Sequence, residues 1–271
     1  MSGPRVMVVC DLDRTLIYSA AALGNEPPPL CCVEQIAGQD AAFMTTGAVA
    51  ALAELRERAE FVPTTTRTRE QYARVRLPGP APRYAIAANG GHLLDGGVSD
   101  AAWQRRVRER LRQGASLAEM SALLSDEANA DWLVRWRVAE ELFCYAIVDR
   151  LRLPDERLAE LSDRAVHRGW TLSLQGRKLY LVPISLTKSA AAAELAGRLG
   201  ADVVLAAGDS LLDVDLLEYA DQAVRPAHGE LQLADWSPPG LQVTAAVGVQ
   251  GGEELVRWLV CAAGGHRAAR D

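Results

Sequence analysis

Lysine is almost absent from this 271-residue chain. Only Lys178 and Lys188 are lysines among the 29 basic residues, and the other 27 are arginines. An ammonium group is a compact point charge, whereas a guanidinium group is a planar fork, so the two are not interchangeable at a tightly packed site. Against this arginine-rich background, each lysine is a candidate for a position that requires a compact cation.

The chain also lacks a positive net charge, a metal-binding cysteine pattern and a long apolar run. Its formal net charge is −6, which gives no general attraction to nucleic acid. The five cysteines are an odd set with one adjacent pair, so we expect reduced thiols and neither a zinc site nor a disulfide framework. No run approaches a membrane span, and no cleavable leader is recognised. We therefore expect a cytoplasmic protein with no nucleic-acid or membrane partner, and the oligomeric state stays open.

What the sequence does contain is an alternation of apolar strands and amphipathic helices. In the first part of the chain this alternation is joined by a possible hairpin at residues 30–45, around a Gly-Gln-Asp turn. Alternating strands and helices predict an α/β fold in which helices cover a parallel, Rossmann-like sheet. The expected strands cover residues 5–10, 60–65, 84–89 and 201–209, and the expected helices cover residues 47–58, 188–199 and 211–220.

The pattern changes at about residue 92 and returns at about residue 185. Between these points the sequence predicts two successive helix–strand–strand units, which form a smaller α+β domain and do not continue a parallel sheet. We therefore expect a core of residues 1–91 and 185–271, interrupted by an inserted domain of residues 92–184. The expected elements of the insertion are a helix at 100–126, strands at 132–140 and 142–149, a helix at 154–168 and a hairpin at 170–184.

Polar side chains follow the expected core strands at the points where the strands end. In open α/β sheets, ligands bind at the carboxyl ends of the strands, so these side chains are candidates for one site. They are Asp11, Asp13 and Thr15, then Thr64 to Thr66, then Asn89, and finally Asp209, with Lys188 opening a nearby helix.

The acids and the lysine of this set fit metal-assisted phosphoryl transfer. Asp11 and Asp13 are two residues apart, and nearby carboxylates repel each other unless a cation or a shared proton intervenes. Mg²⁺ prefers oxygen ligands and often binds substrate phosphate oxygens as well. Asp209 supplies a third acid, and Asp213 lies four residues later on the same helical face. Lys188 can offset the charge of an attacking carboxylate and of a transferred phosphoryl group.

Four segments of the chain resemble the ordered motifs of the haloacid-dehalogenase (HAD) superfamily phosphatases. DLDRT at 11–15 is similar to their DxDx[TV] signature, and Thr64 to Arg67 to their Thr-Gly-Arg motif. LTKSAAAAEL and GDSLLDVDLL, which begin at Leu186 and Gly208, resemble the third and fourth motifs. The insertion resembles the C2-type cap of the Cof-type, sucrose-phosphate phosphatase and mannosyl-3-phosphoglycerate phosphatase groups. The resemblance therefore implies a HAD-fold core with a C2-type cap.

The resemblance also implies a role for each motif residue. Asp11 would be the nucleophile, and Asp13 the general acid and then the general base. Thr65 would bind the phosphoryl group, and Lys188 would stabilise charge. Mg²⁺ would be held by the side chains of Asp11 and Asp209 and the backbone carbonyl of Asp13, with Asp213 acting through water. The resemblance implies that the substrate is a small phosphorylated metabolite, a sugar phosphate or a related compound.

The first and second motifs each depart from the family pattern. Arg14 stands where the family often has glycine, and its side chain would narrow or charge the entrance to the site. Thr66 replaces the glycine that usually follows the motif threonine, so either Thr64 or Thr65 could bind the phosphoryl group. Arg67 occupies the position of the motif arginine and is a candidate for substrate binding.

The fourth motif and the insertion leave further alternatives. Leu212 replaces an asparagine frequent in the family, which loosens the assignment of Asp213 and leaves Asp215 as a substitute. Asn89 is either a substrate contact or part of a tight turn. Arg177 and Lys178 lie in the predicted cap hairpin, where they bind a second anionic group of the substrate or are simply solvated.

Three functional hypotheses follow. The first is a phosphomonoesterase, the second a phosphomutase of the phosphomannomutase type, and the third a non-catalytic regulatory protein with the same fold. A hydrolase releases inorganic phosphate, whereas a mutase isomerises its substrate and responds to a bisphosphate activator. The intact set of acids together with Lys188 favours the two enzymes over the regulatory protein.

Overall fold

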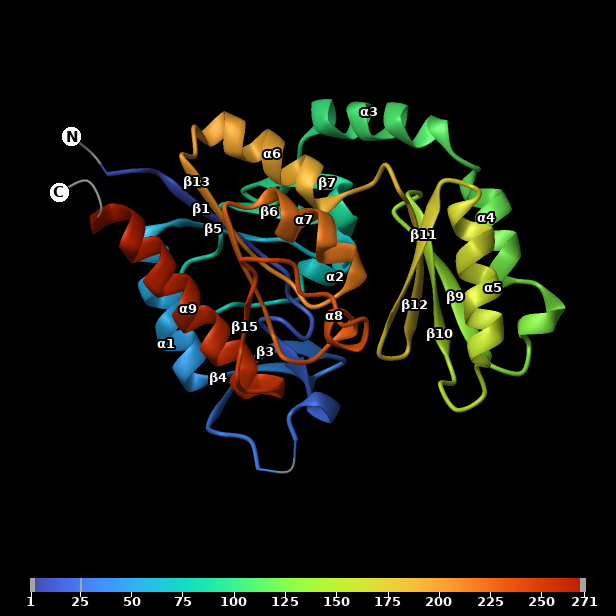
Figure 1. The fold of residues 1–271 in the computed structure, drawn as a ribbon, viewed down its shortest axis with the longest axis horizontal. Coiled ribbons are helices and arrows are strands. Elements are labelled where there is room, and N and C mark those ends of the chain that lie inside the picture. The colour runs from blue at the N-terminus through green and yellow to red at the C-terminus, as the bar shows by residue number, and fades with distance from the viewer. Residues whose placement is uncertain (1–2, 25, 269–271) are drawn as a thin grey trace. The chain divides into compact units, whose positions relative to one another are not determined.

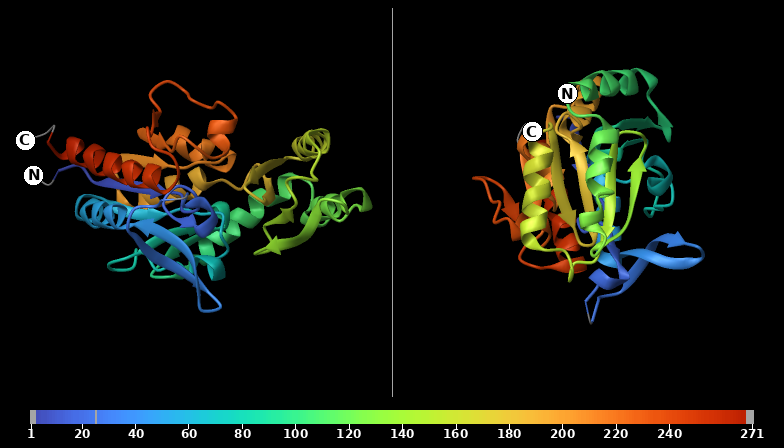
Figure 2. Two further views of the ribbon diagram at one scale, coloured as in Figure 1. Left: turned by 90° about the horizontal axis from the view of Figure 1, so that it is seen from below. Right: turned by 90° about the vertical axis from the view of Figure 1, so that its right-hand side faces the viewer.

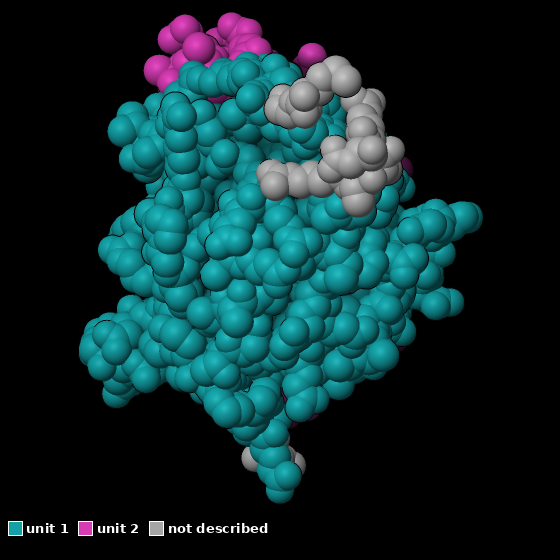
Figure 3. Space-filling model, turned by 90° about the vertical axis from the view of Figure 1, so that its left-hand side faces the viewer, with its two compact units in different colours: residues 1–100, 188–271 teal, residues 101–187 magenta. Residues whose placement is uncertain are grey.

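The computed structural model describes residues 3–24 and 26–268 of the chain in two compact units. Unit 1 is formed by residues 1–100 and 188–271, and unit 2 by residues 101–187 (Figure 3). Unit 2 therefore begins later than the insertion expected at residue 92. The reason is strand pairing, because β7 (His92–Asp95) pairs with β6 (Tyr84–Ala87) and keeps the intervening chain in unit 1.

The centre of unit 1 is a parallel five-stranded sheet in the order β15-β14-β13-β1-β5. All five residues of β1, which lies between β13 and β5, are buried, as expected for a strand covered on both faces. This sheet confirms the predicted α/β fold. Its strands are β1 (Val6–Cys10), β5 (Glu60–Pro63), β13 (Val203–Ala207), β14 (Gln222–Arg225) and β15 (Gln242–Val243).

Helices cover this sheet on both sides, as Figures 1 and 2 show. On one side α1 (Thr46–Arg58) and α9 (Gly248–Ala268) lie next to each other. The buried residues of α1 are Ala48, Ala51, Leu52 and Leu55, the spacing of one helical face, and they pack against the sheet in a common apolar core. The remaining helices of unit 1 are α2 (Arg69–Tyr72), α6 (Lys188–Leu199), α7 (Val214–Tyr219) and α8 (Glu230–Leu233).

Two small antiparallel sheets complete unit 1. The hairpin predicted at 30–45 is present as β3 (Leu30–Ile36) and β4 (Gln39–Thr45), joined to β2 (Tyr18–Ser19). The strand expected at 84–89 is present as β6. It pairs with β7, which in turn pairs with β8 (Val98–Ser99). β6 therefore belongs to a separate antiparallel sheet and not to the parallel sheet. A single parallel bridge between Thr64 and Ile86 connects it to the end of β5.

Unit 2 has the predicted α+β character. Its antiparallel four-stranded sheet has the order β11-β12-β10-β9 and carries α4 and α5 against it. The single helix expected at 100–126 is divided in two, because Ser116 starts a new helix with a capping box to Glu119. The elements are α3 (Ala101–Arg110), α4 (Leu117–Leu124), β9 (Leu133–Ala139), β10 (Phe143–Val148), α5 (Asp155–Val166), β11 (Trp170–Gln175) and β12 (Lys178–Pro183).

Short 3₁₀ helices occur in both units. The 3₁₀ segments are Ala20–Ala22, Ala88–Gly90, Leu111–Gln113, Glu127–Asn129 and Leu211–Asp213. Over residues 3–24 and 26–268, no helix combines the length and the apolar character that a membrane span requires.

We expect Thr45→Ala to destabilise unit 1. Thr45 caps α1 by accepting a hydrogen bond from Ala48 N, and its hydroxyl donates to Glu253 Oε2 of α9 at 2.6 Å. Loss of a threonine cap costs about 1–2 kcal/mol. Urea unfolding monitored by circular dichroism measures this loss. Thr46→Ala is the matched control, because Thr46 is exposed in the same first turn; equal losses in both variants would show that the cap is not responsible.

Candidate active site

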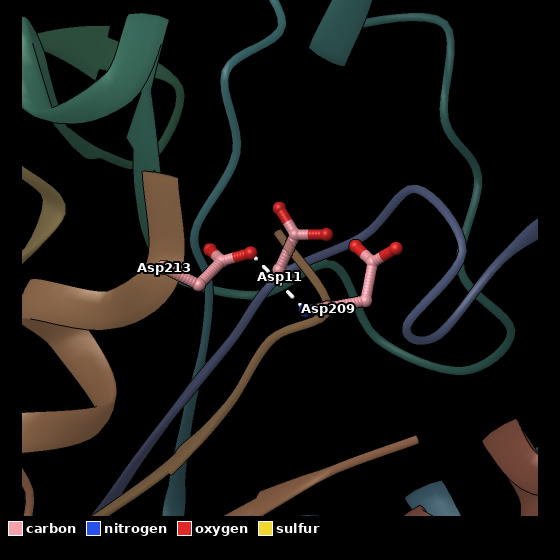
Figure 4. A group of neighbouring side chains, drawn as sticks. All are labelled: Asp11, Asp209 and Asp213. Carbon is pink, nitrogen blue, oxygen red and sulfur yellow. Dashed lines mark hydrogen bonds between the residues drawn. The ribbon is translucent and has the colours of Figure 1, made fainter. Parts of the chain in front are cut away.

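The carboxyl ends of two neighbouring strands bring three buried aspartates together. Asp11 follows β1 and Asp209 follows β13, and these strands pair in parallel up to Cys10 and Ala207. Asp213 comes from the short helical turn that follows Asp209. One carboxylate oxygen of each acid lies within 4.8 Å of the others, and Figure 4 shows the three side chains side by side. The strand-end pattern predicted that Asp11, Asp13 and Asp209 lie together; the structure places Asp11 and Asp209 together with Asp213, and Asp13 is not among these three acids.

Lys188 joins two of these acids. Its ammonium donates to Asp11 Oδ1 at 2.6 Å and to Asp213 Oδ1 at 2.5 Å, and only 1% of the residue is exposed. Burial alone would lower the pKa of Lys188, but the attraction of the two carboxylates outweighs burial and raises it. The lysine therefore stays charged in the interior.

The other oxygen of Asp213 orders the turn that carries Asp209. Oδ2 of Asp213 accepts hydrogen bonds from the backbone N–H groups of Asp209 and Ser210, at 3.1 and 3.0 Å, and from Ser210 Oγ at 2.7 Å. Both oxygens of Asp213 are thus engaged by protein donors. Whether Asp213 contributes to metal binding through water, as the resemblance implies, stays a prediction.

The electrostatics of the group fit a divalent cation. Burial raises the pKa of Asp11 to about 7, against the attraction of Lys188 and together with the repulsion of Asp213. Burial, followed by repulsion from Asp11 and Asp213, also raises the pKa of Asp209 well above its usual range. The Lys188 ammonium contacts only two of the three buried carboxylates, and a cluster of hard oxygen ligands of this kind suits Mg²⁺. The residues present therefore fit a magnesium ion.

Arg14 and Thr15 surround the outer side of Asp209. Thr15 Oγ1 donates to Asp209 Oδ1 at 3.4 Å, and Arg14 Nε lies 3.5 Å from Asp209 Oδ2. Arg14 has a φ of 64°, in the left-handed region that favours glycine. The Nε2–H group of His228 donates a hydrogen bond to Arg14 O at 2.8 Å.

Asp13 does not point at the three acids but pairs with Arg67. Arg67 donates to both oxygens of Asp13, at 2.7 Å from Nε and 2.8 Å from Nη2. The third edge of its guanidinium faces Glu34, with Nη1 2.8 Å from Oε2. Arg67 is therefore placed on the second aspartate of the motif, and its expected contact with substrate remains a prediction. Glu34 was missed by sequence reasoning, although it is the one charged residue of its strand.

The two candidate threonines differ in their hydroxyl contacts. Thr64 Oγ1 donates back to Val62 O at 3.1 Å, whereas Thr65 Oγ1 accepts from Arg67 N at 3.1 Å. The hydroxyl proton of Thr65 thus remains available for an anion, and this contrast favours Thr65 over Thr64. Asn89 lies beside it, because Asn89 N donates to Thr65 O at 3.0 Å, and a φ of 55° makes Asn89 part of a tight turn.

Asp215 lies outside the group of three acids and serves the helix that carries the lysine. Its carboxylate accepts a hydrogen bond from Ser189 N at 2.8 Å, at the first turn of α6. An acceptor at this position satisfies a backbone donor of the helix start, so Asp215 is better explained as a cap than as a substitute for Asp213.

Arg177 and Lys178 lie in unit 2, as expected for cap residues. Arg177 is exposed in the β11–β12 turn and its Nε donates to Val148 O at 3.4 Å. Lys178 begins β12 and lies opposite Ile147 of β10.

Comparisons with known proteins identify the fold. No family model matches the chain, and no curated protein matches its sequence. Among solved structures, the sucrose-phosphatase of Synechocystis sp. PCC6803, in complex with sucrose and phosphate, superposes with a TM-score of 0.66 at 15% identity, covering 94% of this chain and 98% of that one.

Two further structures extend the comparison. The C-terminal domain of C. albicans trehalose-6-phosphate phosphatase has a TM-score of 0.55 at 12% identity and covers 96% of this chain and 93% of that one. A HAD phosphatase of Bacteroides thetaiotaomicron has a TM-score of 0.55 at 13% identity, with coverages of 97% and 96%. The chain has the fold of the HAD superfamily phosphatases, which confirms at the level of the fold the resemblance carried by the four motifs.

We expect Gly229→Ala to weaken Mg²⁺ binding. Gly229 has a φ of 89°, and a Cβ there would lie 2.5 Å from Asp209 Oδ2, so the carboxylate must move. Disturbing the support of a metal ligand typically lowers affinity roughly 10–100-fold. Isothermal titration calorimetry with MgCl₂ measures this affinity. Gly240→Ala is the control, because its φ of 87° imposes similar strain with no atom within 4 Å; equal affinities in the two variants would exclude Asp209 from the site.

Proposed function

We propose that this protein is a Mg²⁺-dependent phosphohydrolase that cleaves a small phosphomonoester through an aspartyl-phosphate on Asp11. The observation that carries the proposal is the buried contact of Lys188 with Asp11 and Asp213 at the carboxyl ends of the parallel strands. The similar structures include a sucrose-phosphatase and a trehalose-6-phosphate phosphatase, which supports a sugar phosphate as substrate class.

The residues of the site account for both halves of such a reaction. A carboxylate oxygen of Asp11 attacks phosphorus, the bond from phosphorus to the ester oxygen breaks, and Asp13 gives its proton to that oxygen. Asp13 then takes a proton from water, whose oxygen attacks phosphorus, releasing phosphate and restoring Asp11. Lys188 and the hydroxyl of Thr65 stabilise the phosphoryl oxygens in both steps.

The magnesium ion belongs to this proposal. Asp11 and Asp209 would hold it through their side chains and Asp13 through its carbonyl, and Asp213 would act through water. When bound, the ion supplies positive charge that offsets the phosphoryl oxygens. Asp11 Oδ1 is already engaged by Lys188 at 2.6 Å, which leaves the second oxygen for the ion or for phosphorus.

Four residues are candidates for substrate binding. Arg67 and Asn89 belong to unit 1. Arg177 and Lys178 belong to unit 2, and the sequence predicts that they bind a second anionic group of the substrate. The cytoplasmic location expected from the sequence is part of the same proposal.

The direct test is phosphate release from a panel of sugar phosphates with Mg²⁺, with excess chelator, and with the Asp11→Asn variant. We expect release only by the wild type with Mg²⁺, because an amide is a poor nucleophile and a poor metal ligand. Asp11→Asn is nearly isosteric, so circular dichroism should show an unchanged fold. Wild-type rates in that variant would refute the nucleophile, and isomerisation without phosphate release would favour the mutase.

We expect Lys188→Arg to be far more damaging than a charge-conserving change usually is. The guanidinium is too broad for a position 2.6 Å from one carboxylate and 2.5 Å from another. Loss of one well-placed charge-stabilising donor costs roughly 100–1,000-fold in kcat. Arg58→Lys, a charge-conserving change on the exposed side of α1, is the control for phosphate release. Similar rates in both variants would show that the compact ammonium is not required.

A further inference from the structure

Behind Asp13 a series of polar contacts extends beyond the motif residues to Glu34 and Arg74, which the proposed reaction does not use. Arg67 contacts Asp13 through Nε and Nη2, and its Nη1 lies 2.8 Å from Glu34 Oε2. The other oxygen of Glu34 accepts from Arg74 Nε at 3.2 Å. Glu34 is 3% exposed and Arg67 is 9% exposed.

The backbone fixes Glu34 in this position. Glu34 belongs to β3 of the hairpin and forms an antiparallel bridge with Val75, and Arg76 N donates to Val33 O at 2.7 Å. The hairpin is thereby joined to the segment that follows Arg67 and α2. A register shift in the β3–β4 ladder accompanies this position, so the strand is locally irregular where it supplies the carboxylate.

Stability alone is a weak reason for such an arrangement. Two charges removed from water lose hydration that their attraction often fails to restore, and apolar residues of similar volume are commonly as good or better. A planar guanidinium held at two edges is, however, fixed in orientation. The paired contact with Arg67 therefore fixes the orientation of the Asp13 carboxylate, whose side chain is 34% exposed.

We propose that Glu34 is a positioning residue for Asp13, which acts through Arg67 to fix where the general acid presents its proton. This inference rests on the proposed function. Glu34 holds one edge of the guanidinium, and the opposite edge then holds Asp13 in a single orientation. Without the carboxylate of Glu34, Arg67 loses its second anchor, and Asp13 loses the fixed direction that proton transfer requires.

The role predicts a dependence on the leaving group. An alkoxide leaves from a sugar phosphate only when an acid protonates it, whereas p-nitrophenolate is a stable anion that leaves without a proton. General acid catalysis contributes roughly 100–10,000-fold, and misplacement by about 1 Å costs on the order of 100-fold. We expect Glu34→Gln to lower kcat for glucose 6-phosphate about 10–100-fold, within the range of those effects, and to leave kcat for p-nitrophenyl phosphate close to the wild-type value.

The experiment compares both esters for the wild type, Glu34→Gln and a matched control, Glu54→Gln. Glu54 pairs with Arg58 on the exposed side of α1, away from Asp13, and should leave both rates unchanged. If glucose 6-phosphate is not accepted, the fastest alkyl phosphate of the panel replaces it. Equal losses on both esters by Glu34→Gln would overturn the inference, because a general loss of structure does not distinguish leaving groups. A wild type that releases phosphate from neither class would instead refute the proposed function.

A second variant tests the chain of contacts even if Glu34→Gln folds poorly. Arg67→Lys keeps one positive charge but cannot span Asp13 and Glu34 together. Arg67→Lys should lower kcat for the alkyl ester more than kcat for p-nitrophenyl phosphate. Adding Glu34→Gln to this variant should lower kcat little further, since both changes interrupt the same contacts between Glu34, Arg67 and Asp13. Additive losses in the double variant, or an Arg67→Lys variant that slows both esters equally, would show that Glu34 does not act through Arg67.

Discussion

The contact of one ammonium with two carboxylates determines the geometry of the whole site in unit 1. Lys188 holds Asp11 at the end of β1 and Asp213 after β13, so it joins the two central strands and α6 at one point. Asp213 in turn orders the backbone of Asp209 and Ser210. Removing the charge would leave two buried acids facing each other, which is far more costly than losing a surface pair.

The helix that presents this lysine is itself fixed by the same motif. Asp215, two residues after Asp213, accepts from Ser189 N at the start of α6. Asp213 of the fourth motif thus binds the Lys188 ammonium, and Asp215 caps α6, the helix that carries Lys188. Both acids lie near the positive end of the α6 dipole, where negative charge is stabilised. The spacing of the two aspartates therefore has a structural explanation that does not require both to bind metal.

Local patterns were sufficient to predict much of the core, and long-range pairings explain what was missed. Apolar runs that end in acids placed Asp11 and Asp209 together, because adjacent parallel strands end at the same edge of the sheet. The start of unit 2 was predicted too early, since the pairing of β7 with β6 leaves no signal in composition. Glu34 was missed because its contact with Arg67 depends on how the hairpin meets a distant segment. The choice between Thr64 and Thr65 required hydroxyl directions, which a sequence does not contain.

The unequal use of lysine and arginine also has a geometric reason at this site. Arg67 meets Asp13 with two parallel contacts and Glu34 with a third, which only a planar fork with several donors can make. Lys188 instead lies between two carboxylates at 2.5 and 2.6 Å in a space with almost no exposure, which a point charge fits. Rarity alone does not identify such a position, because the other lysine, Lys178, begins strand β12 of unit 2 opposite Ile147 of β10. Lys188 differs because it is the first residue of α6, a helix whose N-terminus faces the ends of the strands. The rarity of lysine therefore indicated a functional position only in combination with the order of strands and helices.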